Sequence, residues 1–81
     1  MKFTGHAERE LVRRRLQREW VEQTVDLPEF VISDPSDATV LRAFRRIEAL
    51  EGRWLRVVYA IRGGEVLVIT AFPDRDAERY R

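Results

Sequence analysis

The sequence contains no cysteine, and only one of its 15 basic residues, Lys2, is a lysine. The lack of cysteine excludes a disulfide framework, a thiolate nucleophile and a zinc site built on thiolates. No segment approaches the roughly 18 consecutive apolar residues of a membrane-spanning helix. The amino terminus also lacks the apolar stretch of a secretory signal. We therefore expect a cytoplasmic protein that does not insert into a membrane.

The chain has 81 residues, which is enough for one small domain, and we expect residues 1–81 to fold as a single unit. Hydrophobic residues make up 44% and charged residues 36%, a balance typical of a folded domain. The preference for arginine favours an acidic partner such as nucleic acid, because the planar guanidinium pairs with phosphate or carboxylate through two hydrogen bonds. A thermophilic genome, or one rich in guanine and cytosine, would explain the same preference without a partner.

Two short helices are predicted in the first third of the chain. Thr4 is placed to cap a helix over about residues 5–15, which has acidic residues in its early turns and arginines at its end, as the helix dipole prefers. A second helix over about residues 18–26 carries an apolar stripe that includes Trp20 and Val21. Pro28 disfavours helical geometry in the residue before it and so ends this helix.

The rest of the chain has the composition of strands. Residues 30–32 predict a short strand, and the turn-forming residues 33–37 predict a loop. Gly63 and Gly64 separate two β-favouring segments, 54–62 and 65–72, as in a hairpin with a two-residue turn. Such a turn pairs Arg62 with Glu65, Tyr59 with Val68, Val57 with Thr70, and Leu55 with Phe72. The predicted core contains Leu11, Val21, Val57, Tyr59, Val68 and Phe72.

Residues 40–47 fit two interpretations. Val40, Phe44 and Ile47 have helical spacing, whereas Leu41, Ala43 and Ile47 alternate with arginines as in a strand. Periodicity alone slightly favours a helix here.

The first predicted helix places one titratable ring beside two cations. His6 lies in its first turn, and Arg9 and Arg13 follow about one and two turns later on the same side. Because histidine exchanges protons near neutral pH, this arrangement suits proton transfer next to a phosphate held by arginine. The alternative is a histidine that caps or packs the start of the helix.

Other arginines recur along the chain, notably Arg42, Arg53, Arg56 and Arg75. If these arginines lie together on one surface, they would form a phosphate-binding patch. The alternative is a surface on which the 14 acidic residues balance the arginines, so that no net electrostatic field remains. A single histidine with Asp74 and Asp76 has no known metal-ligand spacing, so neither a metal nor a cofactor is expected.

Two long segments carry a resemblance to a known family: HAERELVRRRLQREWVEQTVDLPEFVISDP (6–35) and RAFRRIEALEGRWLRVVYAIRGGEVLVITAFPDR (42–75). They resemble the bacterial domain of unknown function 4258 (DUF4258) family. Its members combine a histidine-alanine pair, an arginine-rich first helix, a second helix ended by proline, a DP turn, and closing strands that read LRVV and VVTAFFDR. That family is similar to the RelE/ParE and BrnT-type toxins, several of which cut messenger RNA.

The resemblance implies an α+β, RelE-like fold in which two N-terminal helices pack on a small antiparallel sheet. It also implies a strand over residues 40–47, paired with 54–62, which is the opposite of the periodicity preference. The second phenylalanine of the closing motif is replaced by Pro73 here, a change expected to shorten the last strand.

The function implied by the resemblance is that of a toxin: a metal-independent endoribonuclease that acts on RNA and is held inactive by an antitoxin protein. By their positions in the family's motifs, the expected catalytic residues are His6, Arg13 and Arg56, and the expected substrate-binding residues are Arg9, Arg75 and Thr70. Either His6 or Glu10 would accept the proton of the attacking 2′-hydroxyl. Two alternatives stay open: a non-catalytic module of the same fold that binds nucleic acid or protein, and a structural domain that oligomerises through its hairpin.

Overall fold

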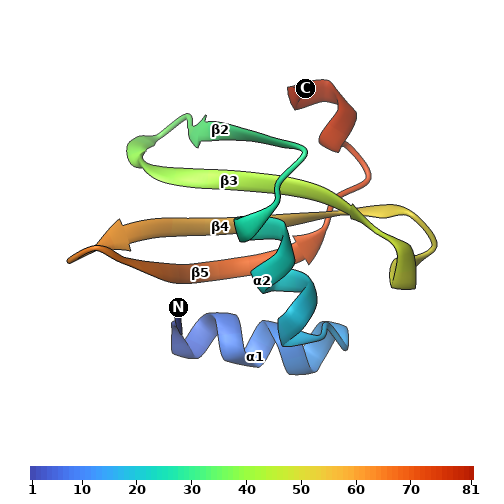
Figure 1. Cartoon of the computed structure of the whole chain (residues 1–81), viewed down its shortest axis with the longest axis horizontal. Helices are drawn as coiled ribbons and strands as arrows, with labels where there is room; N and C mark the ends of the chain where they lie inside the picture. Colours follow the sequence, from blue (N-terminus) through green and yellow to red (C-terminus); the bar gives the residue numbers. More distant parts are fainter.

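The computed structural model describes all residues, 1–81, and has the predicted α+β architecture with both helices ahead of the long strands (Figure 1). The chain runs in the order β1 (Lys2–Phe3), α1 (Gly5–Arg14), α2 (Arg18–Asp26), β2 (Phe30–Asp34), β3 (Asp37–Ile47), β4 (Arg53–Arg62) and β5 (Glu65–Pro73). Short 3-10 helices, η1 (Glu48–Leu50) and η2 (Ala77–Tyr80), follow β3 and β5. The helices lack the combination of length and apolarity that crossing a membrane requires.

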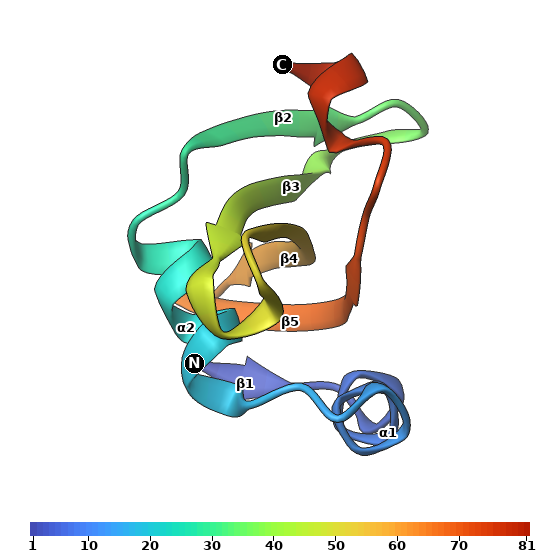
Figure 2. The same ribbon diagram turned by 90° about the vertical axis from the view of Figure 1, so that its right-hand side faces the viewer.

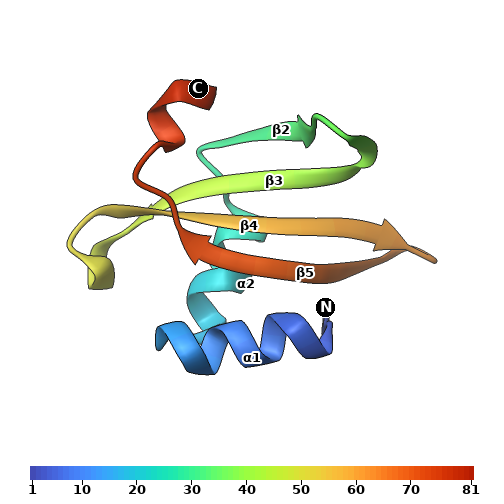
Figure 3. The same cartoon turned by 180° about the vertical axis from the view of Figure 1, so that it is seen from behind.

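The strands form one sheet in the order β1-β5-β4-β3-β2. The four long strands are antiparallel, as predicted, whereas the short β1 pairs in parallel with β5 and was not predicted. Helix α2 covers one face, α1 lies along the β5 border, and the chain after β5 crosses the other face (Figure 2). Seen from that other face, α2 lies behind the sheet (Figure 3). We call this side the open face; its residues include Arg42, Phe44, Arg56, Val58, Thr70 and Phe72.

Both predicted helices are confirmed: α1 ends one residue earlier than predicted, and α2 has the predicted bounds. The Thr4 hydroxyl caps α1 by accepting a hydrogen bond from the Ala7 N–H at 3.0 Å. Arg15, with φ of 56°, ends α1 in the left-handed conformation. Helix α2 ends at Asp26, two residues before Pro28, as the proline predicts.

The turn of the predicted hairpin is confirmed. Gly63 and Gly64 have φ of 58° and 78°, the left-handed values that a primed two-residue turn requires and that glycine adopts without strain. Next to the turn the register is as predicted, with Arg62 opposite Glu65 and Tyr59 opposite Val68.

Farther from the turn the predicted register is wrong by one residue, because β5 contains a bulge at Ile69. An extra residue in one strand reverses the faces of all residues beyond it. The structure pairs Val58 with Thr70, Val57 with Ala71, and Arg56 with Phe72, in place of the predicted Val57 with Thr70 and Leu55 with Phe72. Thr70 and Phe72 therefore lie on the open face. Phe72 is only half-buried there, which corrects its predicted place in the core.

Residues 40–47 belong to β3, so the strand implied by the resemblance is confirmed and the helix favoured by periodicity is wrong. Strand β3 pairs on both sides, with β2 and β4, and neighbouring Ala43 and Phe44 are both fully buried on opposite faces. Burial on two faces makes the hydrophobic pattern uninformative about period. The predicted loop over 33–37 narrows to a turn at Pro35 and Ser36.

Two apolar clusters lie on opposite sides of the sheet. The larger lies between the helices and the sheet and is formed by Ala7, Leu11, Leu16, Val21, Ile47, Leu55, Val57, Val68 and Ala71. The smaller lies on the open face under η2 and contains Phe44, Trp54 and Ala77. Of the predicted core residues, all except Phe72 are buried.

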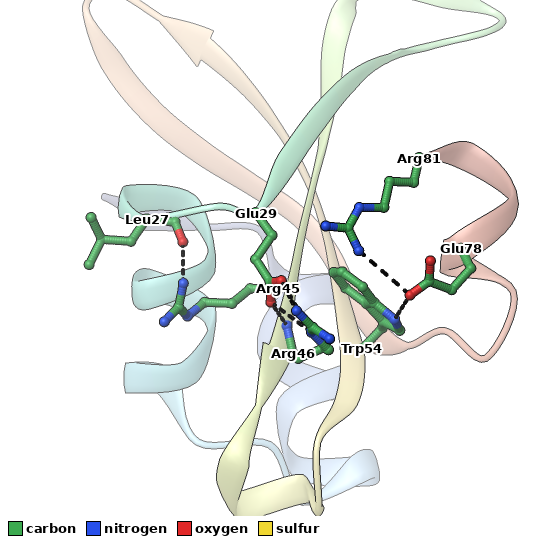
Figure 4. A network of polar contacts seen from close by, with 7 residues as sticks. All are labelled: Leu27, Glu29, Arg45, Arg46, Trp54, Glu78 and Arg81. Carbon is green, nitrogen blue, oxygen red and sulfur yellow. Dashed lines mark hydrogen bonds and ion pairs between the residues drawn. The ribbon is translucent and has the colours of Figure 1, made fainter.

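Polar contacts hold η2 against the open face. Strand β5 ends at Pro73. Beyond it, Glu78 Oε1 on η2 accepts a hydrogen bond from the Trp54 indole N–H at 3.2 Å (Figure 4). Arg81 approaches the same carboxylate at 3.8 Å, and Arg46 pairs with Glu29 at 2.7 Å beside them. The C-terminal residues are thus tied to β4 rather than left as a free tail.

Truncating Val68 should destabilise the protein, because this fully buried side chain fills the larger cluster. We expect Val68→Ala to lower the free energy of unfolding by about 2 kcal/mol, measured by urea denaturation. Val12→Ala is the matched control, since Val12 is 81% exposed on α1 and its truncation should leave the urea midpoint unchanged. Equal midpoints for wild type and Val68→Ala would contradict the burial of this face.

Candidate functional site

The border between α1 and β5 brings together two of the predicted site residues. The Thr4 N–H donates to the Val68 carbonyl and the Thr4 hydroxyl to the Ile69 carbonyl, both at 3.0 Å, which fixes the start of α1 beside the bulge. In the first turn of the helix, the His6 Nε2 lies 3.2 Å from the Thr70 Oγ1. Histidine and threonine thus form an exposed hydrogen-bonded pair at the edge of the open face.

Glu10 and two arginines form an ion-pair cluster farther along α1. Arg13 donates from Nε and Nη2 to both Glu10 oxygens, each at 2.9 Å, and Arg14 Nε donates to Oε1 at 2.9 Å. These hydrogen bonds, chiefly that of Arg13, lower the pKa of the Glu10 carboxyl from 4.5 to about 2. Glu10 therefore stays ionised and paired at neutral pH, and a carboxylate with so low a pKa is a poor proton acceptor. Of the two predicted proton acceptors, His6 is the better placed.

Arg56 lies under the C-terminal segment. Its Nε and Nη2 donate to Asp74 Oδ2 at 2.9 and 2.7 Å, and the side chains are only 12% and 8% exposed. The guanidinium carbon lies 5.0 to 5.4 Å from the ring centres of Phe44, Phe72 and Tyr80. The guanidinium is thus surrounded by aromatic rings and neutralised by a carboxylate. This arrangement suits a residue that holds the C-terminal segment in place.

The other predicted residues make no hydrogen bond with His6 or Thr70. Arg9 and Arg13 line a shallow outward depression of α1 together with Glu8 and Val12. Arg75 is exposed at the end of β5, where it lines a hollow with Arg53 and Trp54. Neither Arg9 nor Arg75 has a carboxylate within 4.0 Å, so both guanidinium groups are available to an anion.

Several residues at the site were missed by sequence reasoning. Arg14 reaches the open face, where its guanidinium carbon lies 5.7 Å from the centre of the Phe72 ring. The spacing of Glu10, Arg13 and Arg14 signals their ion pairs, because residues three and four apart are neighbours on a helix. No local pattern signals the pair of Arg56 with Asp74, since 18 residues separate them. The structure gathers no three histidine, aspartate or glutamate side chains into a cluster that could hold a metal ion.

The family model of a domain of unknown function, DUF4258, matches residues 3–73. The chain belongs to the DUF4258 family. No curated protein and no solved structure matches it significantly. The range matched by DUF4258 includes His6, Thr70 and Arg56, whereas Asp74, Arg75 and η2 lie beyond it.

The low pKa of Glu10 makes the free energy of unfolding of this DUF4258 protein depend on pH at acidic values. Because the folded pKa of about 2 lies below the ordinary 4.5, the ion pairs stabilise the protein above about pH 4.5, and this contribution is lost as the pH falls toward 2. We expect Arg13→Ala to raise the Glu10 pKa, measured from the side-chain carboxyl carbon by NMR. Arg9→Ala, which removes an arginine that does not pair with Glu10, should leave it unchanged. An unaltered Glu10 titration in Arg13→Ala would contradict the ion-pair assignment.

Removing Arg56 should destabilise the DUF4258 fold by leaving the Asp74 carboxylate buried without its partner. We expect Arg56→Ala to lower the free energy of unfolding by about 3 kcal/mol. Arg75→Ala, an exposed control, should change it by less than about 0.5 kcal/mol. The double variant Arg56→Ala with Asp74→Asn should lose less than the sum of the single variants, because no unpaired charge remains. Additive losses would show that Arg56 and Asp74 do not interact.

Proposed function

We propose that this protein is a toxin-like, metal-independent endoribonuclease that binds single-stranded RNA along the border of α1 and β5. The observation that supports the proposal best is the 3.2 Å contact between His6 Nε2 and Thr70 Oγ1. This contact orients the chain's one histidine at an exposed edge of the sheet, and Arg9, about one turn farther along α1, has no carboxylate within 4.0 Å.

The reaction assigned to this site needs no metal. The 2′-hydroxyl oxygen of one nucleotide attacks the adjacent phosphorus, and the bond from phosphorus to the 5′-oxygen of the next nucleotide breaks. His6 accepts the 2′-hydroxyl proton, and the leaving 5′-oxygen takes a proton from water. The products are a 2′,3′-cyclic phosphate and a 5′-hydroxyl end. Thr70 acts as a positioning residue that holds the imidazole ring at one nitrogen.

The arginines divide into two groups in this proposal. Arg9 and Arg75 contact backbone phosphates directly, because no carboxylate occupies them. Arg13 contacts phosphate only by exchanging its two hydrogen bonds with Glu10. Arg56 supports the open face through Asp74 without touching the substrate.

A second candidate function is RNA or protein binding without cleavage. The observation in its favour is that Glu10, the other predicted proton acceptor on α1, is held ionised by two arginines. Cleavage would then depend on His6 alone. In either case an antitoxin-like protein would inhibit the chain by covering the open face with a strand or helix.

The test is an RNA cleavage assay in the presence of EDTA. We expect the wild-type chain to cut a labelled single-stranded RNA and His6→Ala to lose about 100-fold or more in rate while still binding it, since general acid–base catalysis contributes on this scale. Gln23→Ala, an exposed change on α2, is the control and should cut normally. Induced expression in a test bacterium should arrest growth with wild type and Gln23→Ala but not with His6→Ala.

The outcomes separate the two candidates. Binding of RNA without cleavage by the wild-type chain would support the binding module and end the catalytic proposal. Cleavage that survives His6→Ala would remove His6 from the mechanism. Absence of both RNA binding and RNA cleavage would contradict the ribonuclease proposal and leave protein binding as the function to be tested.

A further inference from the structure

A hollow of about 350 Å³ lies at the end of the sheet where β4 begins and β5 ends. Its walls are Arg53, Trp54, Pro73, Asp74 and Arg75. The hollow is separate from the His6–Thr70 pair, but Pro73 and Thr70 are on the same strand. Three residues of an extended strand cover about 10 Å, so one RNA chain running along β5 can reach both places.

Two arginines line the hollow, Arg53 from the start of β4 and Arg75 from the turn that follows β5. Arg53 begins β4 directly after Glu51 and Gly52, whose φ of 59° and 78° make the sharp turn that follows η1. Its Nε donates to the Leu50 carbonyl at 3.2 Å, which anchors the side chain and leaves the terminal nitrogens free. Arg75 enters from the other wall. Neither arginine has a carboxylate within 4.0 Å.

The one acidic residue that lines the hollow, Asp74, already accepts hydrogen bonds at both carboxylate oxygens. Asp74 Oδ2 accepts from Arg56 at 2.7 and 2.9 Å, and Asp74 Oδ1 accepts from the Asp76 N–H at 2.8 Å. Its charge is therefore compensated from outside the hollow. The N–H of Arg75 makes no hydrogen bond within the chain, so it adds a free backbone donor to the two guanidinium groups.

We propose that this hollow binds a phosphate group between Arg53, Arg75 and the Arg75 N–H. Guanidinium groups bind phosphate through paired hydrogen bonds. Donors that converge from β4 and from the turn after β5 match a tetrahedral group with several oxygens better than a planar carboxylate. The phosphate can come from an RNA strand, and this choice of source rests on the proposed function because the same strand would pass His6. Free phosphate uses the same donors without RNA.

The first arm of the test uses inorganic phosphate alone. Amide NMR at constant ionic strength should show a saturable shift at Arg75 with phosphate and none with chloride. Arg53→Gln and Arg75→Gln should each weaken phosphate binding about tenfold, which is the effect of losing one charge-assisted hydrogen bond. Arg79→Gln, which removes an unpaired arginine on η2 outside the hollow, should leave affinity unchanged. A shift that does not saturate, or one that chloride reproduces, would overturn the site.

The second arm uses single-stranded RNA and separates the sources of phosphate. If RNA supplies the phosphate, Arg53→Gln and Arg75→Gln weaken RNA binding, whereas Arg79→Gln does not. RNA binding that these two variants leave intact would overturn RNA as the source, even with phosphate shifts present. Absence of RNA binding in the wild type would contradict the proposed function, while a saturable phosphate shift would still support the hollow as a site for free phosphate.

Discussion

The position of the candidate site depends on three of the hydrogen bonds that Thr4 makes at the start of α1. Its hydroxyl caps the helix at Ala7 and donates to the carbonyl of Ile69, and its N–H donates to the carbonyl of Val68. A bulge leaves a residue outside the ladder, and a polar group there needs another partner. Thr4 supplies that partner and fixes the helix beside the strand at the same point. The bulge turns Thr70 toward the open face, and the fixed helix brings His6 to it.

The arrangement of charge decides more about this protein than its net value of +1. Carboxylates neutralise Arg13, Arg14 and Arg56, so an anion can bind these arginines only by displacing a carboxylate. Other arginines, among them Arg9 and Arg75, have no such partner and can bind an anion without breaking an existing ion pair. The proposed recognition of phosphate therefore rests on which arginines remain unpaired rather than on how many the chain contains.

The C-terminal segment and the open face stabilise one another. Arg56 is enclosed by three aromatic rings and by Asp74, an environment that suits a planar and weakly hydrated guanidinium better than a lysine ammonium. Asp74 in turn holds the Asp76 N–H and starts the turn that leads to η2. The same carboxylate thus fixes the wall of the hollow that contains Arg75, so the structural and the proposed binding roles of this segment meet at one residue.

The sequence by itself determined the local elements: both helices through the Thr4 cap and Pro28, and the hairpin through Gly63 and Gly64. These signals lie within a few residues of the structure they specify. The register beyond Ile69 was decided by tertiary structure, because the bulge is stabilised by Thr4, 65 residues away in the chain. Phe72 and Thr70 could not be assigned to a face without it. Tertiary structure also decided β3, where burial on both faces hides the period of a strand. It decided as well the pairing of Arg56 with Asp74, which depends on the start of β4 lying beside the end of β5.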